Sequence, residues 1–563
     1  MKHELERQIA ENVRELFGVD APIELTRPEE QFGDYSTNVA LQLSKQLGKN
    51  PRQIGEELAD RLRESLAEPV SEVSVAGPGF LNLRLRDQAL LAAAETQPTQ
   101  SLAGQQILVE FGDPNPFKAM HIGHLYSYIV GDAICYVLEA AGAEVKRLSY
   151  HGDVGLHVAK AIWGMQQASY DPATMTDPIK NNIGVYYAAG AQAYEADEAA
   201  KQAIDDINKQ VYAQDPSIKS LYDEGKVRSF ANFDLTLQEM HIKNDGHSND
   251  GRYLESKSAP VGLETVKSNP DVFTESEGAI VFEGEKVGLH TRVFITGKGL
   301  PTYETKDLGL TELKKSDFPQ AARSIIITAN EQAEYFKVML AALKEIDPEL
   351  AGKTRHLTHG FVSLTSGKMS SRTGDVYSAT DLIADVEATL KDLDRGQAEE
   401  IKIGAIKYAF TKHRLGGDLV YDLEESISLE GNSGPYLQYT HARARSILRQ
   451  VNVIPTEAEE SVQPNGSLDF ARDDKVAFED GERSLLRKIG EYSEVVDKSV
   501  AELMPHHIAT YLYELAQTFN RFYEHNRVMG DERQQLRLAL VQRYADTLRS
   551  GLNLLGITAP DKM

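Results

Sequence analysis

The chain is poor in cysteine and lacks any long apolar run. Cys135 is the single cysteine among 563 residues, which excludes an intramolecular disulfide and a cysteine-based zinc site. No stretch approaches the ~20 consecutive apolar residues that a membrane-spanning helix needs. The opening segment, MKHELERQIAENVRELFG, carries charges throughout, where a signal peptide would have an apolar core. We therefore expect no membrane partner and a cytoplasmic location.

Positive charge is also scarce. The chain has 60 Lys and Arg against 85 Asp and Glu, a net charge of −25. This argues mildly against a nucleic-acid partner, because phosphate binding needs cations. In a long chain, however, net charge reports on solubility, whereas RNA binding depends on where the basic residues lie. The remaining composition, 41% hydrophobic and 26% charged, is that of an ordinary globular protein.

The order of patterns along the chain predicts four segments. Residues 1–100 alternate helical patterns with short strand-like runs, which is typical of a small α+β domain. Residues 101–380 form a second domain, with an insertion at about 165–285. Residues 381–430 form a helical connector, and residues 431–563 an all-α bundle.

The second segment begins with a strand, a helix and another strand. Gln106–Phe111 reads QILVEF, a buried parallel strand; a helical pattern from Gly123 to Ala141 follows, and then a strand at Val145–Ser149. This spacing is that of a βαβ unit. The predicted fold class is therefore α/β, with a Rossmann-like doubly wound parallel sheet between an N-terminal α+β domain and an all-α C-terminal domain.

The tetrapeptide His121-Ile122-Gly123-His124 lies where the first strand's loop meets the helix. A helix N-terminus offers unpaired N–H groups and a positive dipole end, which suit phosphate. Gly123 leaves room for a nucleotide against the backbone, and both histidines can donate to phosphate oxygens. Two polar residues at a helix start are the plainer interpretation of the tetrapeptide alone.

A second candidate lies in SGKMSSRTGDV, with Lys368 and Arg372 on a loop rich in glycine and serine. By itself this pattern is equally typical of a solvated basic loop. The pair HIGH and KMSSR, some 245 residues apart, resembles the signature of class I aminoacyl-tRNA synthetases. Longer segments resemble the arginyl-tRNA synthetase family, namely VEFGDPNPFKAMHIGHL, HGFVSLTSGKMSSRTGDVYSATDLI, PTYETKDLG, EGNSGPYLQYTHARARSIL and GDYSTNVALQLSK. The similarity touches almost the whole chain.

Three positions depart from the family's usual pattern. Where the family often reads GDWGTQ, this chain reads GDVGLH from Gly152 to His157, so the fine substrate contacts there are in doubt. The stretch Ile327–Phe336, ITANEQAEYF, replaces the commoner VGADQ type but keeps Gln332. The last cation of the second motif is Arg372, where many class I enzymes have lysine; charge is kept, but geometry differs.

The resemblance implies an ATP-dependent ligase that joins L-arginine to tRNA(Arg), with Mg²⁺ accompanying ATP. We expect no protein-bound metal site and a monomer, although the sequence alone does not reveal the oligomeric state. The resemblance also implies that tRNA binds before arginine is activated and that the N-terminal domain contacts the outer corner of the tRNA. The implied catalytic residues are His121, His124, Lys368 and Arg372. The implied ATP contacts add Gly123, Met369, Ser370 and Ser371. The implied arginine contacts are Glu110, Asn115, Tyr303, Asp307 and Gln332. The implied tRNA contacts are Tyr436, Gln438, Tyr439, Arg443, Arg445 and Arg527.

These residue types suit arginine. A guanidinium has five N–H donors in a planar fork and is always charged, so its pocket needs carboxylates that accept paired hydrogen bonds. Tyr303 and Asp307 stand four apart in a predicted helix and share a face. We assign the side chain of arginine to these two residues, and its α-amino end to Glu110, Asn115 and Gln332. Without the resemblance, Glu110 and Asp307 would each be read as surface charges.

Three other functions remain open. A nucleotidyltransferase could use the same HxGH site to transfer AMP or CMP to a metabolite, although such chains are usually short and lack a helical tail. A non-enzymatic relative could bind tRNA without charging it, although both motifs are intact here. Another amino acid could be the substrate, although Glu110, Tyr303 and Asp307 favour a cation.

Overall fold

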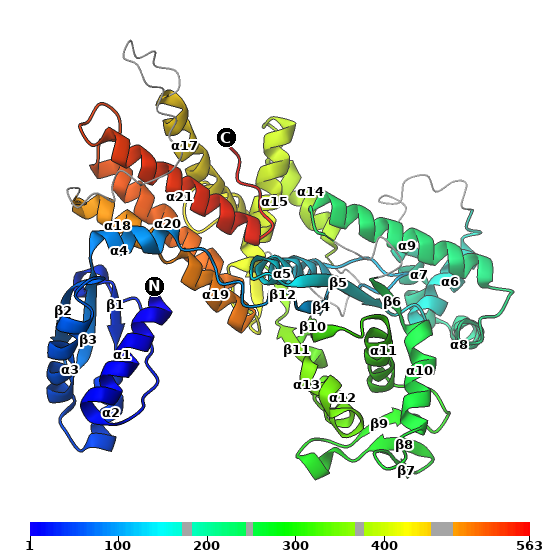
Figure 1. Ribbon diagram of the computed structural model, residues 1–563. Helices are drawn as coiled ribbons and strands as arrows, with labels where there is room; N and C mark the ends of the chain where they lie inside the picture. The colour runs from blue at the N-terminus through cyan, green and yellow to red at the C-terminus, as the bar shows by residue number, and fades with distance from the viewer. Residues whose placement is uncertain (172–182, 244–250, 366–376, 452–476) are drawn as a thin grey trace.

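The computed structural model describes residues 1–171, 183–243, 251–365, 377–451 and 477–563. In the ribbon view, an N-terminal domain lies beside a C-terminal helical domain, and an α/β domain lies on the far side of the helices (Figure 1). The predicted fold class is confirmed. The second predicted motif, at residues 368–372, lies outside the described residues.

The N-terminal domain packs three helices on a small antiparallel sheet. Its strands lie in the order β1-β3-β2, and Leu81 and Leu83 of the central strand are fully buried. Gly33, just before β1, has φ 116°; a side chain there would meet the carbonyl oxygen of Leu83 at 2.7 Å, so only glycine fits this close approach. The elements are α1 (Lys2–Phe17), η1 (Glu30–Phe32), β1 (Tyr35–Thr37), α2 (Val39–Leu47), α3 (Pro51–Ser65), β2 (Val70–Ala76) and β3 (Phe80–Leu85), followed by α4 (Asp87–Glu95).

The central domain is built on a five-stranded parallel sheet in the order β11-β10-β4-β5-β6. Both faces of β4 are buried: Ile107 and Val109 pack on the α5 side, whereas Leu108 packs with Leu310 of α11 on the other. This is why the strand reads as a continuous apolar run. The elements are β4 (Gln106–Glu110), α5 (Ile122–Ala140), β5 (Glu144–His151), β6 (Arg252–Leu254), α11 (Tyr303–Asp317), β10 (Ala321–Ala329), η5 (Asn330–Gln332), α12 (Ala333–Ile346), α13 (Pro348–Lys353) and β11 (Thr354–His359).

The strand order places a crevice in the sheet. From β4 the chain proceeds to β5 and β6 on one side, and later adds β10 and β11 on the other. Ligands of such sheets bind outside the carboxyl ends of the strands at this switch point. Here that point lies between the ends of β4 and β10, which is where the loop to α5 begins.

The stretch predicted as an insertion contains both added helices and a piece of the main sheet. Arg252–Leu254, a strand of only three residues, continues the central sheet beside β5. Later in the same stretch, β8 pairs antiparallel with both β7 and β9 to make a small separate sheet. The elements are α6 (Leu156–Gln167), α7 (Gly184–Ala196), α8 (Glu198–Ala213), α9 (Lys219–Glu239), α10 (Glu255–Lys267), β7 (Thr274–Ser276), β8 (Ala279–Phe282), η4 (Gly284–Val287) and β9 (Arg292–Ile295).

In the described residues that follow β11, the chain is helical apart from one parallel strand pair, β12 (Val362–Leu364) with β13 (Leu419–Tyr421). The sequence suggested almost only helix here, and β13 is the exception. Among the described residues, no helix is both long enough and apolar enough to cross a membrane. The helices are α14 (Ala379–Thr389), α15 (Arg395–Thr411), α16 (Leu423–Ile427), α17 (Gly434–Val451), α18 (Asp480–Ile489), α19 (Tyr492–Glu502), α20 (His506–His525) and α21 (Gln534–Leu554).

Candidate active site

The two histidines at the start of α5 form a reciprocal cap. Nδ1 of His121 accepts the N–H of Gly123 at 3.1 Å, and Nδ1 of His124 accepts the N–H of His121 at 3.3 Å. Their rings stack with centroids 3.6 Å apart. A side chain on Gly123 would lie 3.0 Å from Nδ1 of His121, so glycine at this position preserves the cap.

Burial keeps both rings neutral. It lowers the pKa of His121 to about 4 and that of His124 well below its usual value, and the nearby charge of Lys118 acts in the same direction on both. In a neutral imidazole whose Nδ1 accepts, the proton is on Nε2. Each histidine can therefore donate through Nε2–H at neutral pH.

Lys118 is a cation near the two histidines that was not predicted as a site residue. It lies three residues before His121, close enough for its charge to act on both histidines. Burial lowers the pKa of its own ammonium, and the ammonium lies 4.9 Å from the ring centre of Tyr187. A lysine in the loop that leads into a phosphate-binding helix start is the signal that could have found it.

The chain that follows the second motif is bonded to the first. Ile122 donates its N–H to the carbonyl of Tyr377 at 3.2 Å, and Ala379 donates to the carbonyl of Met120 at 2.9 Å. His121 and Ser378 form an isolated antiparallel bridge. Residues 377–379, which directly follow the undescribed residues 366–376, are therefore hydrogen-bonded to the backbone of the histidine motif.

Behind the helix start, the buried carboxyls of Glu110 and Asp307 and the half-buried carboxyl of Asp113 share a slot with one lysine. Glu110 ends β4 at 1% exposure and forms an ion pair with Lys314 of α11, which is 3% exposed in its side chain. Asp113 accepts the backbone N–H of Tyr150 at 2.7 Å. Asp307 is 5% exposed, and no described lysine or arginine forms an ion pair with it. The slot therefore holds more negative than positive charge.

This excess of negative charge affects the pKa values of the carboxyls in the slot. Burial, and then the charge of Glu110, raise the pKa of Asp307 well above its usual value; a hydrogen bond from Tyr335 acts the other way. The same two causes raise the pKa of Asp113. A cation entering the slot would relieve both effects. Lys314 and Asp113 were not predicted as site residues, although Lys314 follows Asp307 by seven positions and so lies on the same helix face.

The remaining predicted arginine contacts surround the slot. Tyr303, the first residue of α11, projects beyond the helix at 64% exposure, and its ring centre lies 6.3 Å from that of Tyr335. The hydroxyl of Tyr335 donates to Oε1 of Gln332 at 3.3 Å. Asn115 accepts the N–H of Gly152 through Oδ1 at 3.0 Å, which ties the predicted loop to the segment whose sequence departs from the family pattern.

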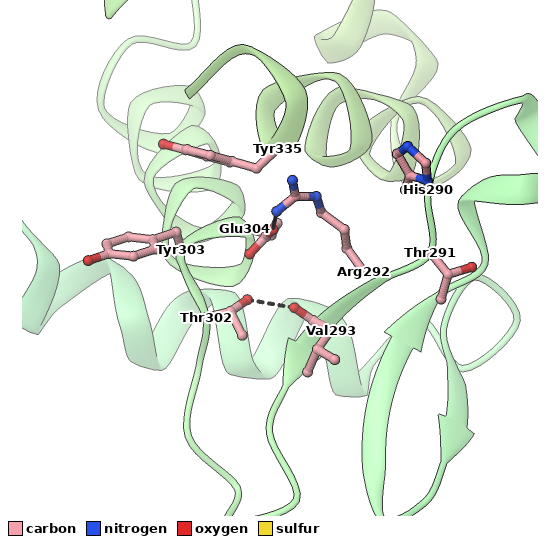
Figure 2. A pocket seen from close by; sticks show the side chains of 8 residues that line it. All are labelled: His290, Thr291, Arg292, Val293, Thr302, Tyr303, Glu304 and Tyr335. Atoms are coloured by element: carbon pink, nitrogen blue, oxygen red, sulfur yellow. Dashed lines mark hydrogen bonds and ion pairs between the residues drawn. The ribbon is translucent and has the colours of Figure 1, made fainter. Parts of the chain in front are cut away.

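Tyr335 also lines an open cavity of about 550 Å³. Figure 2 shows Tyr335 and Tyr303 on its wall, with the Arg292 side chain reaching toward Glu304; these two charges are 3.0 Å apart. The other lining residues are His290, Thr291, Val293 and Thr302. Because Tyr335 is close enough to Asp307 to lower its pKa from this wall, the cavity adjoins the acidic slot.

The predicted tRNA contacts of the helical domain differ in exposure. Tyr439 is 43% exposed, and Arg527 is also exposed, with its Nε donating to the carbonyl of Met529. Arg443, Arg445 and Tyr436 are half-buried. Arg443 lies 4.6 Å from the ring centre of Tyr523, Arg445 bonds to Asp561 at 3.1 Å, and the hydroxyl of Tyr436 accepts from Asn520 at 2.9 Å.

Gln438 requires a correction. Its side chain is fully buried, and its amide donates to the carbonyls of Glu400 and Thr558 at 2.9 and 3.0 Å. It joins α17 to the backbone of α15 and to the C-terminal segment. We therefore assign Gln438 to the packing of the helical domain and remove it from the predicted tRNA contacts.

Three family models match consecutive parts of the chain. "Arginyl tRNA synthetase N terminal domain" matches residues 3–85, "tRNA synthetases class I (R), catalytic domain" matches 87–422, and "DALR anticodon binding domain" matches 437–563. Together they account for nearly the full length.

Named relatives extend over the same length. An arginine–tRNA ligase of Synechococcus elongatus is 30% identical over 96% of this chain and 95% of its own, and one of Flavobacterium psychrophilum is 28% identical over 91% and 90%. The solved arginyl-tRNA synthetase of Thermus thermophilus superposes with a TM-score of 0.82 at 27% identity over all of both chains. The Plasmodium falciparum enzyme, at 21% identity over 100% of this chain and 99% of its own with a TM-score of 0.80, supports the fold.

Proposed function

The chain belongs to the class I arginyl-tRNA synthetases and is an arginine–tRNA ligase, and from that premise we propose how its residues carry out the reaction. The observation that carries the proposal is the buried, cation-free carboxyl of Asp307 beside a helix start with two neutral histidines. One feature suits the guanidinium of arginine, and the other suits the phosphates of ATP.

In the first step, the carboxylate of arginine attacks the α-phosphate of ATP, giving arginyl-adenylate and releasing pyrophosphate. His121 and His124 donate Nε2–H to phosphate oxygens as negative charge builds on them, with Gly123 allowing close approach. Lys118 adds a positive charge from the same loop. Because the chain performs no covalent step of its own, its contribution is positioning and charge stabilisation.

The second motif supplies the opposite side of the phosphate site in this proposal. Lys368 and Arg372 hold the phosphates and the departing pyrophosphate, and the ATP contacts of Met369, Ser370 and Ser371 come from the same segment. The backbone bonds of residues 377–379 to Met120 and Ile122 support this arrangement. Mg²⁺ commonly binds through substrate phosphates with few protein ligands, so we propose that it arrives with ATP.

The acidic slot selects arginine. Asp307 receives the guanidinium through paired hydrogen bonds, and the exposed ring of Tyr303 covers it. Since Glu110 is already paired with Lys314, the unpaired charge that the substrate meets is that of Asp307. Glu110, Asn115 and Gln332 serve the α-amino end. A neutral or short side chain would leave the slot's carboxyls unsatisfied, which makes a separate editing site unnecessary.

In the second step, arginine passes to the 2′-hydroxyl of the tRNA's terminal adenosine. We propose that Tyr439 and Arg527 contact the tRNA directly, and that Tyr436, Arg443 and Arg445 contribute from their half-buried positions. The N-terminal domain contacts the outer corner of the same tRNA, which must bind before arginine is activated. We propose that the domain boundaries lie near residues 100, 380 and 430. We also propose that the protein is a monomer and that it is located in the cytoplasm.

ATP–pyrophosphate exchange tests this proposal, measured with each of the twenty amino acids, with and without tRNA(Arg). We expect exchange with arginine alone, and only when tRNA is present. His124→Ala should lower aminoacylation by about a hundredfold, because it removes a preorganised donor, and it should leave the circular dichroism spectrum unchanged. Exchange with another amino acid would contradict the assigned pocket, and full activity of His124→Ala would contradict the phosphate role.

A further inference from the structure

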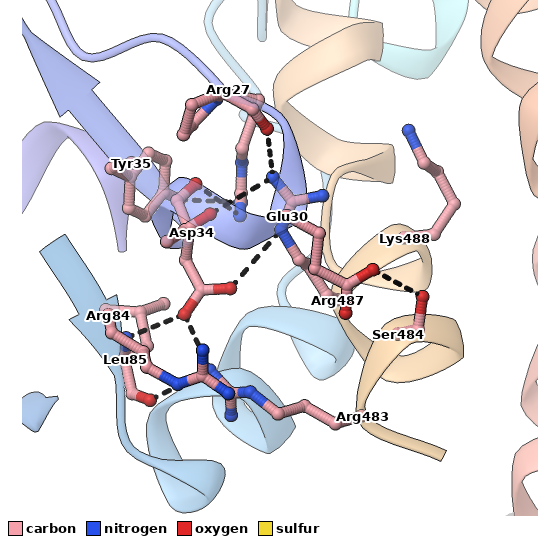
Figure 3. A network of polar contacts seen from close by, with 12 residues as sticks. Arg27, Glu30, Asp34, Tyr35, Arg84, Leu85, Arg483, Ser484, Arg487 and Lys488 are labelled. Carbon is pink, nitrogen blue, oxygen red and sulfur yellow. Dashed lines mark hydrogen bonds and ion pairs between the residues drawn. The ribbon is translucent and has the colours of Figure 1, made fainter. Parts of the chain in front are cut away.

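Asp34 joins the N-terminal domain to the helical domain from a buried position. Its side chain is 3% exposed and lies between two arginines of α18 (Figure 3). Oδ2 accepts from Arg483 at 2.7 Å, and Oδ1 lies 3.3 Å from Nε of Arg487. Oδ2 also accepts the N–H of Leu85 at 2.7 Å, so the carboxylate is tied to its own domain and to the other one.

Both arginines also bond to other groups on the N-terminal side, and Arg487 in addition pairs with Glu491 at 3.6 Å. Arg483 bonds to Asp87 at 2.6 Å and to the carbonyl of Leu85 at 3.0 Å. Arg487 donates to the carbonyl of Pro28 at 2.7 Å. The side chains of both arginines are 9% exposed. Each planar fork thus fixes a direction as well as a distance.

Such a network acts mainly on geometry. The cost of removing charges from water offsets much of their attraction, so a buried ion pair adds little net stability; losing one partner, however, leaves the others buried and uncompensated. A tilted or shifted N-terminal domain would break this set of contacts at once. Apolar packing between α4 and α18, through Leu90 and Leu486, tolerates small shifts much better because it is not directional.

Weaker contacts surround the network. Arg27 pairs with Glu494 of α19 at 2.7 Å, and the hydroxyl of Ser484 donates to the exposed carboxylate of Glu30 at 2.8 Å. The residues that Arg487 holds at Pro28 and Asp34 bracket the short helix η1, whose last residue, Phe32, is 49% exposed. An exposed ring of this kind can stack on an unpaired base, and its direction is set by the loop that Arg487 fixes.

We propose that Asp34, with Arg483 and Arg487, locks the N-terminal and helical domains into one rigid body that binds tRNA as a unit. Asp34 is a positioning residue: it faces the other domain and acts on tRNA only through the orientation it fixes. The inference rests on the proposed function in one respect, the contact of both domains with tRNA. The lock itself is independent of that function.

The lock is tested by a distance measurement. Cysteines introduced at the exposed positions Ser65 and Ser550 carry spin labels, one on each domain, while the native Cys135 is buried. In the otherwise unchanged full-length chain we expect one narrow distance distribution. Asp34→Asn should broaden it. Glu30→Gln, which removes only the charge from a rim contact of the same interface, should leave it narrow. Equal, narrow distributions in all three proteins would overturn the lock.

The consequence for tRNA is tested by steady-state kinetics. Asp34→Asn should raise the KM for tRNA about tenfold and leave the KM values for arginine and ATP and kcat within twofold, because the acidic slot is untouched; Glu30→Gln should change none of them. Arg487→Met, which keeps the Asp34–Arg483 pair, is the second variant should Asp34→Asn fail to fold, and it should raise the tRNA KM severalfold.

The outcomes separate the lock from the function. A broadened distribution with an unchanged KM for tRNA would overturn the rigid unit as a determinant of tRNA binding. Equal rises in the KM values for tRNA, arginine and ATP would also overturn it, because they indicate general disruption. If the unmodified chain failed to charge tRNA with arginine, the proposed function would fail, and the distance measurement would still decide the lock.

Discussion

Asp34 and Asp307 are both buried carboxyls, and they lie in opposite electrical surroundings. Asp34 is held by two arginines and a backbone N–H. Asp307 shares its slot with Glu110 and Asp113, and a single lysine in the slot is already paired with Glu110. Burying an unpaired charge is costly. The difference indicates that the first carboxyl fixes structure, and that the second is kept ready for a cation from outside.

The largest expected effect is on catalysis at Asp307. Asp307→Asn should lower kcat/KM for arginine by about ten thousandfold, the scale on which a site built for specific hydrogen bonds rejects a mismatch. The measurement is aminoacylation at varied arginine. Asp317→Asn, an exposed change on the same helix, is the matched control and should be neutral. A decrease in kcat/KM of less than tenfold in Asp307→Asn would contradict the assignment of Asp307 to arginine binding.

Stability should change in opposite directions at the two sites. Asp34→Asn removes the charge that both arginines share and leaves them only Asp87 and Glu491 as ion-pair partners, so it should lower the free energy of unfolding by about 3 kcal/mol. The raised pKa of Asp307 means that the native state holds this proton more tightly than the unfolded chain, so stability is lost as pH rises through the raised pKa. Asp307→Asn should therefore leave stability at neutral pH unchanged or higher. Urea denaturation measures both free energies of unfolding. An equal decrease for Asp307→Asn and Asp34→Asn would contradict the view that only Asp34 has a structural role.

The pH dependence of arginine binding should follow Asp307. As pH falls through its raised pKa the carboxyl becomes neutral, and the KM for arginine should then rise, approaching about tenfold per pH unit. The KM for ATP should stay flat over the same range until the histidines protonate, which for His121 occurs near its pKa of about 4. Parallel rises in both KM values would show that the slot does not titrate separately.

The smallest expected effects concern two neighbouring residues of the helical domain, one exposed and one buried. Tyr439→Ala should raise the KM for tRNA about tenfold, because base stacking is worth about 1–3 kcal/mol. Its neighbour Gln438→Ala should leave that KM unchanged and lower the free energy of unfolding by about 1–3 kcal/mol, because it strands two buried carbonyls. The reverse pattern would return Gln438 to the tRNA surface.

Local patterns predicted the parts of the fold that depend on neighbouring residues. The βαβ unit followed from an apolar run, a helical period and a second strand, and the structure places those elements within two residues of the expected bounds. The strand β6 was not predicted, because three residues are too few to show the alternation of polar and apolar residues that indicates a strand. The helix bearing Tyr303 and Asp307 was expected, and α11 begins at Tyr303.

Contacts between distant residues could not be read in the same way. Asp34 and Arg483 are 449 positions apart, and Gln438 and Thr558 are 120 apart. A glutamine among tyrosines and arginines looks like an RNA-binding surface until the C-terminal segment covers it. Likewise, nothing in the sequence indicates that Lys314 forms an ion pair with Glu110. The sequence therefore could not show that Asp307 is the carboxyl without such a partner.

The central claim is that a spare negative charge in this slot recognises the charge of the substrate. Citrulline has nearly the shape of arginine and no charge, so isothermal titration of both ligands, with tRNA(Arg) bound, tests the claim directly. We expect citrulline to bind at least a thousandfold more weakly than arginine, and the difference to shrink to about tenfold in Asp307→Asn, since one charge-assisted pair is then lost. Binding of citrulline within tenfold of arginine in the unmodified chain would contradict it.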